Sequence, residues 1–297
     1  MDNVDGTDGT DGTDGTDGTD GTGGTGGTGG TGGTGGTGVS GLVGRTVVVT
    51  GGTRGVGAGI ARAFVGAGAT VLVCARRPPG TPVPGVEFVP LDLCDPSAVH
   101  TFFGALPRLD VLVNNAGGAP YRPLADAGAE RHARVIALNL VAPLTASLAA
   151  YAHLRRAGGS IVMIGSVSGT RPSPGSAAYG AAKAGLENLA RSMAVEWAPA
   201  VRVNTLVVGM VRTELSHLHY GGEDGVAAVS RTVPLGRLAE PYDVGEAAVF
   251  LASDAAAYIS GASLLVHGGG ERPAFLDAAT VNRADPTGRS GPPGGER

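Results

Sequence analysis

The segment RTVVVTGGTRGVG, which spans Arg45–Gly57, decides the fold. Its first six residues are rich in β-branched side chains and predict a short buried strand, and an apolar helical pattern follows its glycines. Gly51, Gly55 and Gly57 let the chain turn sharply and let its backbone approach a ligand closely. The amino end of the following helix offers free N–H groups and a positive partial charge. A strand, a glycine-rich turn and a helix in this order predict a site for the pyrophosphate of a dinucleotide.

Short apolar runs alternate with longer amphipathic stretches along the rest of the chain. The strand candidates are continuously apolar, which favours strands covered on both faces, as in parallel sheets. They are Arg45–Thr50, Thr70–Cys74, Val86–Pro90, Leu109–Val113, Ser160–Ile164, Val201–Leu206 and Ser263–Val266. The helix candidates are Val56–Ala67, Pro96–Ala105, Ala129–Arg156, Ala177–Trp197 and Tyr242–Ala252. Pro143 is expected to bend or divide the third helix. The alternation predicts an α/β fold with a doubly wound parallel sheet, the Rossmann fold.

One folded domain is expected between two less ordered segments. Residues 1–39 are almost wholly Asp, Gly and Thr in DGT and GGT repeats, so they have nothing to bury and are predicted to form a disordered low-complexity tail. Residues 40–270 suit a single α/β domain, and residues 271–297 are interpreted as a C-terminal extension that is mostly loose. Without the seven aspartates of the tail, the formal net charge changes from −4 to +3. The acidity of the chain is therefore not a property of the predicted domain.

Composition argues against several other classes of protein. No block of basic residues indicates nucleic-acid binding. The sequence contains no run of about 18 apolar residues, so no membrane span is predicted. Cys74 and Cys94 are too few for a disulfide framework, so a reducing, cytoplasmic location is expected. His217 and His219 lack a third candidate ligand, and no metal site is predicted.

The end of the second predicted strand indicates which dinucleotide binds. An acidic residue there would bind the ribose hydroxyls of NAD(H) and repel a 2′-phosphate. The sequence has Arg76 and Arg77 instead, and Arg54 lies inside the glycine-rich turn. Guanidinium groups near the adenosine ribose favour a 2′-phosphate, so NADP(H) is predicted in preference to NAD(H). The alternative is that Arg76 and Arg77 are ordinary solvated turn residues.

Two other strand ends offer candidate cofactor contacts. Asp92, in the sequence LDL after the third strand, presents a carboxylate to the adenine amino group. In NNAG after the fourth strand, Asn114 and Asn115 either tie adjacent strand ends together or contact the ligand. Gly117 leaves room for the cofactor.

Candidate catalytic groups follow the fifth predicted strand. Tyr179 and Lys183 are four residues apart on one predicted helix, so their side chains share a face. The nearby ammonium is expected to lower the pKa of the phenol from its usual value near 10, which would give an acid or base suited to neutral pH. Ser166 ends a strand and is placed to hold a carbonyl oxygen, with Ser168 as a rival. Asn139 is either a satisfied core amide or a helix-bending anchor for a relay water.

Taken in order, these motifs resemble those of the short-chain dehydrogenase/reductase (SDR) family, in its single-domain branch. The resemblance covers roughly Leu42–Gly270 and includes TGGTRGVG, LDL, NNAG, YGAAK and a long segment from Gly236 that reads GRLAEPYDVGEAAVFLASDAAAYISGASLLVHGG. It implies that Tyr179 exchanges a proton with the substrate oxygen and that Ser166 orients this oxygen. Lys183 would bind the nicotinamide ribose, and Asn139 would hold a relay water. The implied cofactor contacts are Gly51, Thr53, Arg54, Gly55, Val56, Gly57, Arg76, Asp92, Leu93, Asn115, Ala116, Gly117, Tyr179, Lys183, Gly209, Val211 and Thr213.

The expected activity is therefore an NADP(H)-dependent interconversion of a ketone and a secondary alcohol. Apolar residues in the glycine-containing segment Thr213–Pro234 suggest a flap over an apolar pocket, or they simply pack together. Substrates considered are 3-oxoacyl thioesters, polyketide-type ketones and hydroxysteroids. Gly209 follows a valine where family members usually have proline, and His267 replaces a usual aspartate, which puts substrate geometry in doubt. The alternative function is an NADP(H)-binding redox sensor without turnover. A homodimer or homotetramer is implied by the family.

Overall fold

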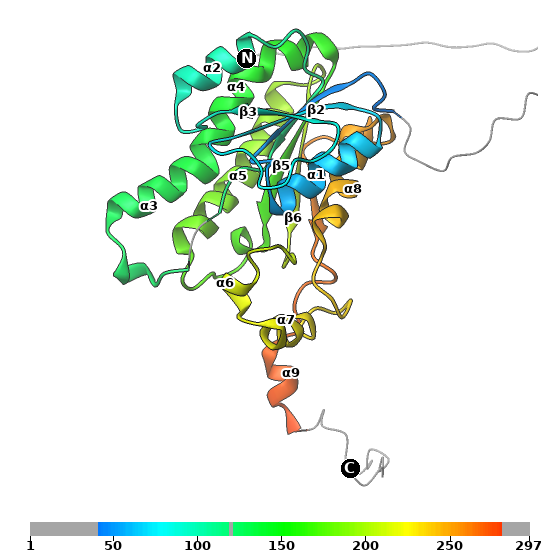
Figure 1. The fold of residues 1–297 in the computed structure, drawn as a ribbon. Helices are drawn as coiled ribbons and strands as arrows, with labels where there is room; N and C mark the ends of the chain where they lie inside the picture. The colour runs from blue at the N-terminus through cyan, green and yellow to red at the C-terminus, as the bar shows by residue number, and fades with distance from the viewer. Residues whose placement is uncertain (1–40, 119–120, 281–297) are drawn as a thin grey trace, which may run out of the picture. The chain divides into compact units, whose positions relative to one another are not determined.

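Seven strands form one parallel sheet in the order β3-β2-β1-β4-β5-β6-β7 within residues 41–118 and 121–280, which the computed structural model describes (Figure 1). They are β1 (Thr46–Thr50), β2 (Thr70–Ala75), β3 (Val86–Pro90), β4 (Val111–Asn114), β5 (Ser160–Ser166), β6 (Arg202–Val208) and β7 (Ser263–Val266). The strand order reverses between β1 and β4, which places a ligand-binding crevice at their carboxyl ends. The predicted doubly wound α/β fold is confirmed, and each predicted strand is present with ends that differ by at most two residues.

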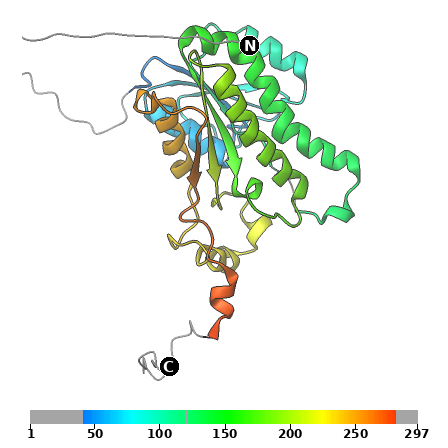
Figure 2. The ribbon, with the colours of Figure 1, turned by 180° about the vertical axis from the view of Figure 1, so that it is seen from behind.

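Helices cover both faces of the sheet (Figures 1 and 2). One face carries α1 (Gly55–Gly66) and α8 (Pro241–Ala252), and the other carries α2 (Pro96–Gly104), α4 (Ala142–Ala157) and α5 (Ala177–Glu196). The first pair packs closely because glycines line its contact. A Cβ built on Gly59 would lie 2.4 Å from Pro241 Cβ, and one on Gly245 would lie 2.7 Å from Ala63 Cβ. A larger side chain at either glycine would push α1 away from α8 and misplace the amino end of α1.

The disturbance predicted for the long third helix near Pro143 takes the form of a π-helical turn. α3 (Ala129–Ile136) passes into a π-helical turn at Ala137–Val141 before α4 begins. Pro143 comes directly after this turn within the continuous helix, and it has no N–H to donate to Asn139 O four residues earlier. The interruption surrounds the buried Asn139, and single π-helical turns of this kind are frequent at functional sites.

The same run of helix is long and apolar enough to cross a membrane by length and composition alone, from Ala129 to Ala157. One face of it packs on the sheet through side chains such as Ala146, Ala150 and Leu154, which are fully buried. These contacts are those of a core helix in an α/β domain. The helix therefore passes the test of length and hydropathy, and the prediction that no segment spans a membrane stays a prediction.

The segment after β6 forms a lid with its own small core. It contains α6 (His217–Tyr220) and α7 (Glu223–Ser230), which follow the carboxyl end of β6 (Figure 1). The lid core consists of the buried Val226, Val233 and Leu238 and the partly buried Met210, Tyr220 and Val229. Most apolar residues that the sequence assigned to a substrate pocket therefore pack against one another. This favours the alternative that these residues simply pack together.

Parts of the predicted domain scheme fall outside the described residues. The predicted tail at residues 1–39 lies outside them, as do residues 281–297 of the C-terminal extension. The described start of the extension contacts the lid, because Arg272 N donates to Thr232 O at 2.9 Å. A short helix, α9 (Ala274–Ala278), follows. The predicted boundaries at residues 39 and 270 stay predictions.

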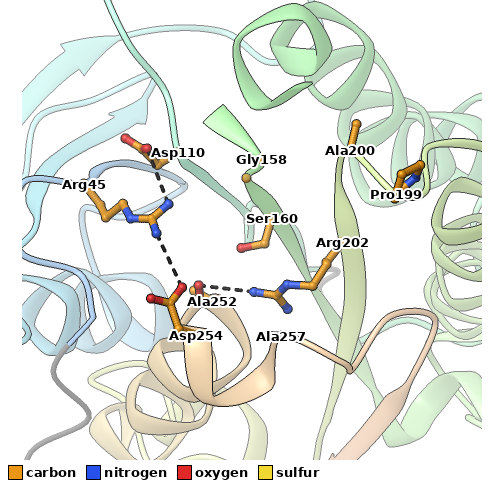
Figure 3. A pocket seen from close by; sticks show the side chains of 11 residues that line it. Arg45, Asp110, Gly158, Ser160, Pro199, Ala200, Arg202, Ala252, Asp254 and Ala257 are labelled. Atoms are coloured by element: carbon orange, nitrogen blue, oxygen red, sulfur yellow. Dashed lines mark hydrogen bonds and ion pairs between the residues drawn. The ribbon is translucent and has the colours of Figure 1, made fainter. Parts of the chain in front are cut away.

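The amino ends of the strands enclose a polar cavity of about 240 Å³ (Figure 3). Asp110 is fully buried there and accepts hydrogen bonds from Arg108 Nε at 2.7 Å and from Thr46 N at 2.8 Å. Arg202 donates to Leu251 O at 2.8 Å and to Ile259 O at 3.3 Å, so its guanidinium caps the carboxyl end of α8. These contacts join strands, loops and α8 at the amino ends of the strands, whereas the glycine-rich turn lies at their carboxyl ends. We assign the cavity a structural role.

Candidate active site

The glycine-rich turn has a backbone that requires its glycines. Gly51 and Gly55 have φ values of +66° and +52°, in the left-handed region that glycine favours. A Cβ on Gly51 would lie 2.8 Å from Ala116 Cα, and one on Gly57 would lie 2.3 Å from Gly51 O. Arg54 precedes α1 without a side-chain cap, and the first turn of α1 contains no acidic residue. The amino end of α1 therefore keeps N–H groups available for an anion.

The carboxyl ends of β1 and β4 are tied together next to this turn. Thr50 Oγ1 donates to Val113 O at 3.2 Å and accepts from the backbone N–H groups of Asn115 and Ala116 at 3.0 and 3.1 Å. Asn115 Nδ2 donates to Thr50 O at 2.9 Å and to Gly51 O at 3.1 Å. Of the two interpretations left open for Asn115, the structural tie accounts for its side-chain amide. Its position beside Gly51 still brings its backbone to the predicted cofactor site.

Two cations lie at the predicted adenosine end. Arg54 and Arg76 are exposed, and no acidic side chain in the described part of the chain forms an ion pair with either. Burial and the Asp92 carboxylate raise the pKa of the Cys94 thiol, whereas the Arg76 guanidinium lowers it. Arg76 therefore lies close to the end of β3, where Asp92 Oδ1 accepts from Cys94 N at 2.9 Å. Leu93 is buried in the same turn.

The candidate catalytic side chains converge at the carboxyl end of β5. Ser166 is the last residue of β5, and its hydroxyl lies close enough to the Tyr179 phenol to lower the pKa of that phenol. Tyr179 and Lys183 lie in the first two turns of α5, and Lys183 Nζ lies 5.5 Å from the centre of the Tyr179 ring. Lys183 Nζ donates to Ile164 O at 2.7 Å, which fixes the ammonium against β5. The sequence spacing alone correctly predicted that these side chains share a face.

The pKa of Tyr179 does not move in the predicted direction. Burial raises it, and the nearby Ser166 hydroxyl only partly opposes this effect. Burial also lowers the pKa of Lys183 to about 8. Because Lys183 donates to a backbone carbonyl rather than to the phenol, its charge does not dominate the titration of Tyr179. The expectation of a lowered tyrosine pKa is therefore wrong for the protein chain by itself.

The side-chain amide of Asn139 is not free, because it holds the backbone of the loop at Gly118. Asn139 Nδ2 donates to Val135 O at 2.9 Å and to Gly118 O at 3.0 Å, and Asn139 Oδ1 accepts from Gly118 N at 2.9 Å. A Cβ built on Gly117 would lie 2.4 Å from Asn139 Oδ1 and 3.5 Å from Lys183 Nζ. Gly117 thus lies between Asn139 and Lys183. The side chain of Asn139 is a satisfied amide, so a relay water would have to bind another atom of this residue.

The predicted contacts after β6 also reach the site. Thr213 Cγ2 would lie 3.5 Å from a Cβ on Gly55, so the start of the lid meets the glycine-rich turn. Val211 pairs with Ala239 in an isolated bridge that anchors this segment. Gly209 packs against His267, since a Cβ on Gly209 would lie 2.7 Å from His267 Cβ. His267, which replaces a usual aspartate, therefore contacts the glycine that follows Val208.

The sequence analysis did not predict two features near the site. Glu214, directly after Thr213, places Oε1 3.9 Å from a Cβ built on Gly55. Arg171, in the loop between Ser166 and Tyr179, forms an ion pair of 2.5 Å with Glu271 of the C-terminal segment. The acidic residue after Thr213 was the available signal for the first. No local pattern indicates a pair of residues separated by 100 positions.

The chain matches the family described as Enoyl-(Acyl carrier protein) reductase over residues 51–271. With its glycine-rich turn, switch point and tyrosine–lysine pair, it has the features of a dinucleotide-dependent oxidoreductase. The chain belongs to the short-chain dehydrogenase/reductase family, whose members use NAD(P)(H).

Relatives and solved structures agree with this assignment. The L-fucose dehydrogenase of Oryctolagus cuniculus is 35% identical over 243 residues, which cover 77% of this chain and 85% of the relative. The D-threitol dehydrogenase of Mycolicibacterium smegmatis is 33% identical, with 77% of this chain and 93% of the relative covered. The aldohexose dehydrogenase of Thermoplasma acidophilum superposes with a TM-score of 0.72 at 29% identity, over 76% of this chain and 93% of that chain. A Beutenbergia cavernae protein described as an NAD(P)-dependent gluconate 5-dehydrogenase, with NADP bound at low occupancy, gives a TM-score of 0.71 at 35% identity over 78% and 98% of the two chains.

Proposed function

We propose that this chain is an NADP(H)-dependent oxidoreductase that interconverts a ketone and a secondary alcohol. The convergence of Ser166, Tyr179 and Lys183 at the end of β5 carries this proposal. A phenol with a serine hydroxyl beside it presents two groups to one carbonyl oxygen. The glycine-rich turn lies at the neighbouring strand ends, so a dinucleotide bound there would bring its reactive ring to the same edge of the sheet.

Each polar group has a separate role in this proposal. A bound nicotinamide cofactor supplies or accepts the hydride. Tyr179 donates a proton to the carbonyl oxygen during reduction and removes it during oxidation, and Ser166 orients that oxygen. Lys183 binds the nicotinamide ribose and carries positive charge beside Tyr179. Asn139 shapes the π-helical turn and holds the Gly117–Gly118 backbone beside Lys183, and a relay water would use its backbone.

The residues at the glycine-rich turn fit a dinucleotide. Gly51 and Gly57 leave space that a Cβ would fill, and the amino end of α1 has no acidic residue in its first turn. The guanidinium groups of Arg54 and Arg76 form no ion pair within residues 41–118 and 121–280, and they support NADP(H) over NAD(H) because each can bind a 2′-phosphate. Asp92 and Leu93 at the end of β3, and Ala116 at the end of β4, would contact the adenosine.

For the substrate, we favour a carbonyl compound that carries further hydroxyl groups over the apolar ketones predicted from the sequence. Tyr220, Val226 and Val229 of the lid pack into the lid core, whereas Leu218 is 65% exposed. Burial and Glu271 raise the pKa of Tyr220 while Arg171 lowers it, so the lid tyrosine lies beside the Arg171–Glu271 pair. These polar groups suit hydroxyl ligands. The relatives named for L-fucose and D-threitol support the same class.

A screen of NADPH oxidation with a panel of carbonyl compounds tests this proposal. The panel should contain ketoses and other hydroxylated ketones beside 3-oxoacyl thioesters, polyketide-type ketones and oxosteroids. We expect turnover to be concentrated among the hydroxylated compounds. Turnover confined to the apolar members would restore the first substrate prediction. NADPH binding without turnover of any member would favour the redox sensor.

We also propose that the protein forms a homodimer or homotetramer. Leu148 of α4 and Val195 of α5 are 55% and 80% exposed, and Val141 of the π-helical turn is 49% exposed. Apolar side chains on helices of one face are suited to contact with a second copy. The cytoplasmic location and the lack of a nucleic-acid partner stay predictions from composition.

A further inference from the structure

The first residues of the lid lie against the glycine-rich turn. A Cβ built on Gly55 would lie 3.5 Å from Thr213 Cγ2, 3.8 Å from Thr213 Cβ and 3.9 Å from Glu214 Oε1. Gly55 is the first residue of α1, at the end of the helix that carries positive partial charge. The carboxylate of Glu214 is therefore close to the part of the molecule that would hold a pyrophosphate.

Hydrogen bonds fix the backbone that carries Glu214. Thr213 N donates to Ser216 Oγ at 2.8 Å, and Ser216 N donates to Thr213 O at 3.0 Å. Leu215 N donates to Thr213 Oγ1 at 3.3 Å. Ser216 is buried, with 5% of its surface exposed, so this turn is anchored to the body of the domain. The position of Glu214 over α1 is thus imposed by the turn.

The Glu214 carboxylate has no other strong partner that would hold it there. Glu214 is exposed, and its carboxylate forms no hydrogen bond or ion pair with any side chain among the described residues. Of the neighbouring charged groups, Arg212 is already paired with Glu223 at 2.9 Å. The amino end of α1, whose partial charge also attracts phosphate groups, is the part of the protein that Glu214 Oε1 lies against, and the exposed Arg54 directly precedes it.

We propose that Glu214 determines the affinity for the cofactor by competing with the pyrophosphate for the amino end of α1. This inference rests on the proposed function, since it assumes that NADP(H) binds at the glycine-rich turn. Two phosphate charges and a carboxylate in one place repel one another, so binding the cofactor displaces the Glu214 side chain. The hydrogen-bonded turn keeps its backbone in place, so only the exposed Glu214 side chain has to move.

Replacing the carboxylate by an isosteric amide tests the inference. In the full-length protein, Glu214→Gln should bind NADPH roughly three- to tenfold more tightly than wild type at low ionic strength, measured by NADPH fluorescence. The gain should shrink in 0.5 M salt, because exposed charges are then screened. Asp224→Asn removes the same charge from an exposed position of α7 and is the matched control, with an expected change of less than twofold.

A ligand without a pyrophosphate separates local repulsion from a general change in charge. Adenosine 2′-monophosphate keeps the 2′-phosphate but lacks the pyrophosphate, so its affinity should be the same in wild type and Glu214→Gln. Equal NADPH affinities in wild type and Glu214→Gln, or equal gains for both ligands, would overturn this inference alone. Failure of every variant to bind NADPH or NADH would overturn the proposed function and this inference with it.

Discussion

Burial moves the pKa of Tyr179 upward and that of Lys183 downward, to about 8, so both groups keep their protons at neutral pH. A protonated phenol beside a serine hydroxyl is the form that can donate to a carbonyl oxygen. The removal of the proton in the oxidising direction then depends on the charges that the bound cofactor and Lys183 add. Burial therefore has a larger effect on the pKa values of Tyr179 and Lys183 than neighbouring charges have.

The lowered pKa of Lys183 makes a testable contribution to stability. The unfolded chain binds this proton up to a pH of about 10.4, whereas the folded chain releases it near pH 8, so between these values the unfolded state holds more protons. The free energy of unfolding of wild type should therefore rise relative to that of Lys183→Met across this window, by up to about 3 kcal/mol. Urea unfolding of both proteins from pH 7.5 to 10.5 measures the difference. A difference that stays constant with pH would show that Lys183 is not desolvated.

Arg76 should determine the preference between the two dinucleotides. Without this guanidinium the 2′-phosphate loses a charge-assisted hydrogen bond, so Arg76→Ala should weaken NADPH binding by about tenfold. NADH binding should stay within about twofold of wild type, since NADH has no 2′-phosphate. Fluorescence titration with both cofactors makes the comparison. An unchanged affinity for NADPH would remove the basis for the cofactor prediction.

Among the structural elements, α8 has its last carbonyl groups capped by an arginine from β6, in addition to Ser253. Arg202 at the start of β6 donates to the carbonyl oxygens of Leu251, Ala252, Ser253 and Ile259. Arg202→Ala should lower the free energy of unfolding by about 2–4 kcal/mol, because partly buried carbonyl groups lose their donors. Arg191→Ala, which removes one side of an exposed pair with Glu187 on α5, should cost about 0.5 kcal/mol or less. Urea unfolding of the two variants tests this difference, and equal losses would contradict the capping role.

The sequence predicts the strands and helices closely. The differences between prediction and structure occur where the chain leaves a regular helical or strand pattern. Apolar runs and glycines locate β1 and α1 because burial and backbone freedom act locally. The π-helical turn around Asn139 was missed, since a hydrophobic period does not report one extra residue in a turn. The choice between an apolar pocket and simple packing in the lid stayed open, because an apolar side chain that lines a pocket and one that fills the lid core have the same sequence pattern.

At the scale of the whole molecule, the exposed apolar side chains of α4 and α5 predict association. We expect light scattering at micromolar concentration to give the mass of a dimer or tetramer. Leu148→Glu places a charge in the proposed contact and should shift the protein toward the monomer, while Arg155→Glu serves as a control for surface charge near the end of the same helix. A monomeric wild type would contradict the prediction.

The identity of the reacting groups is easier to predict than the identity of the substrate. Tyr179, Lys183 and Ser166 occur at fixed positions relative to β5 and α5, so sequence spacing locates them. Arg171 and Glu271 come together only through the fold, and Glu214 reaches Gly55 only because the lid folds back on α1. Long-range contacts of this kind have no local pattern in the sequence, and we propose that they shape the substrate and cofactor sites.

The central claim is that Tyr179 performs the proton transfer of an NADPH-dependent carbonyl reduction. The most direct measurement compares wild type and Tyr179→Phe for NADPH oxidation, with the best carbonyl substrate from the screen, alongside NADPH affinity by fluorescence. Loss of general acid catalysis should lower kcat by at least about 100-fold while the Kd for NADPH changes by less than about threefold. Retention of wild-type turnover by Tyr179→Phe would contradict the account.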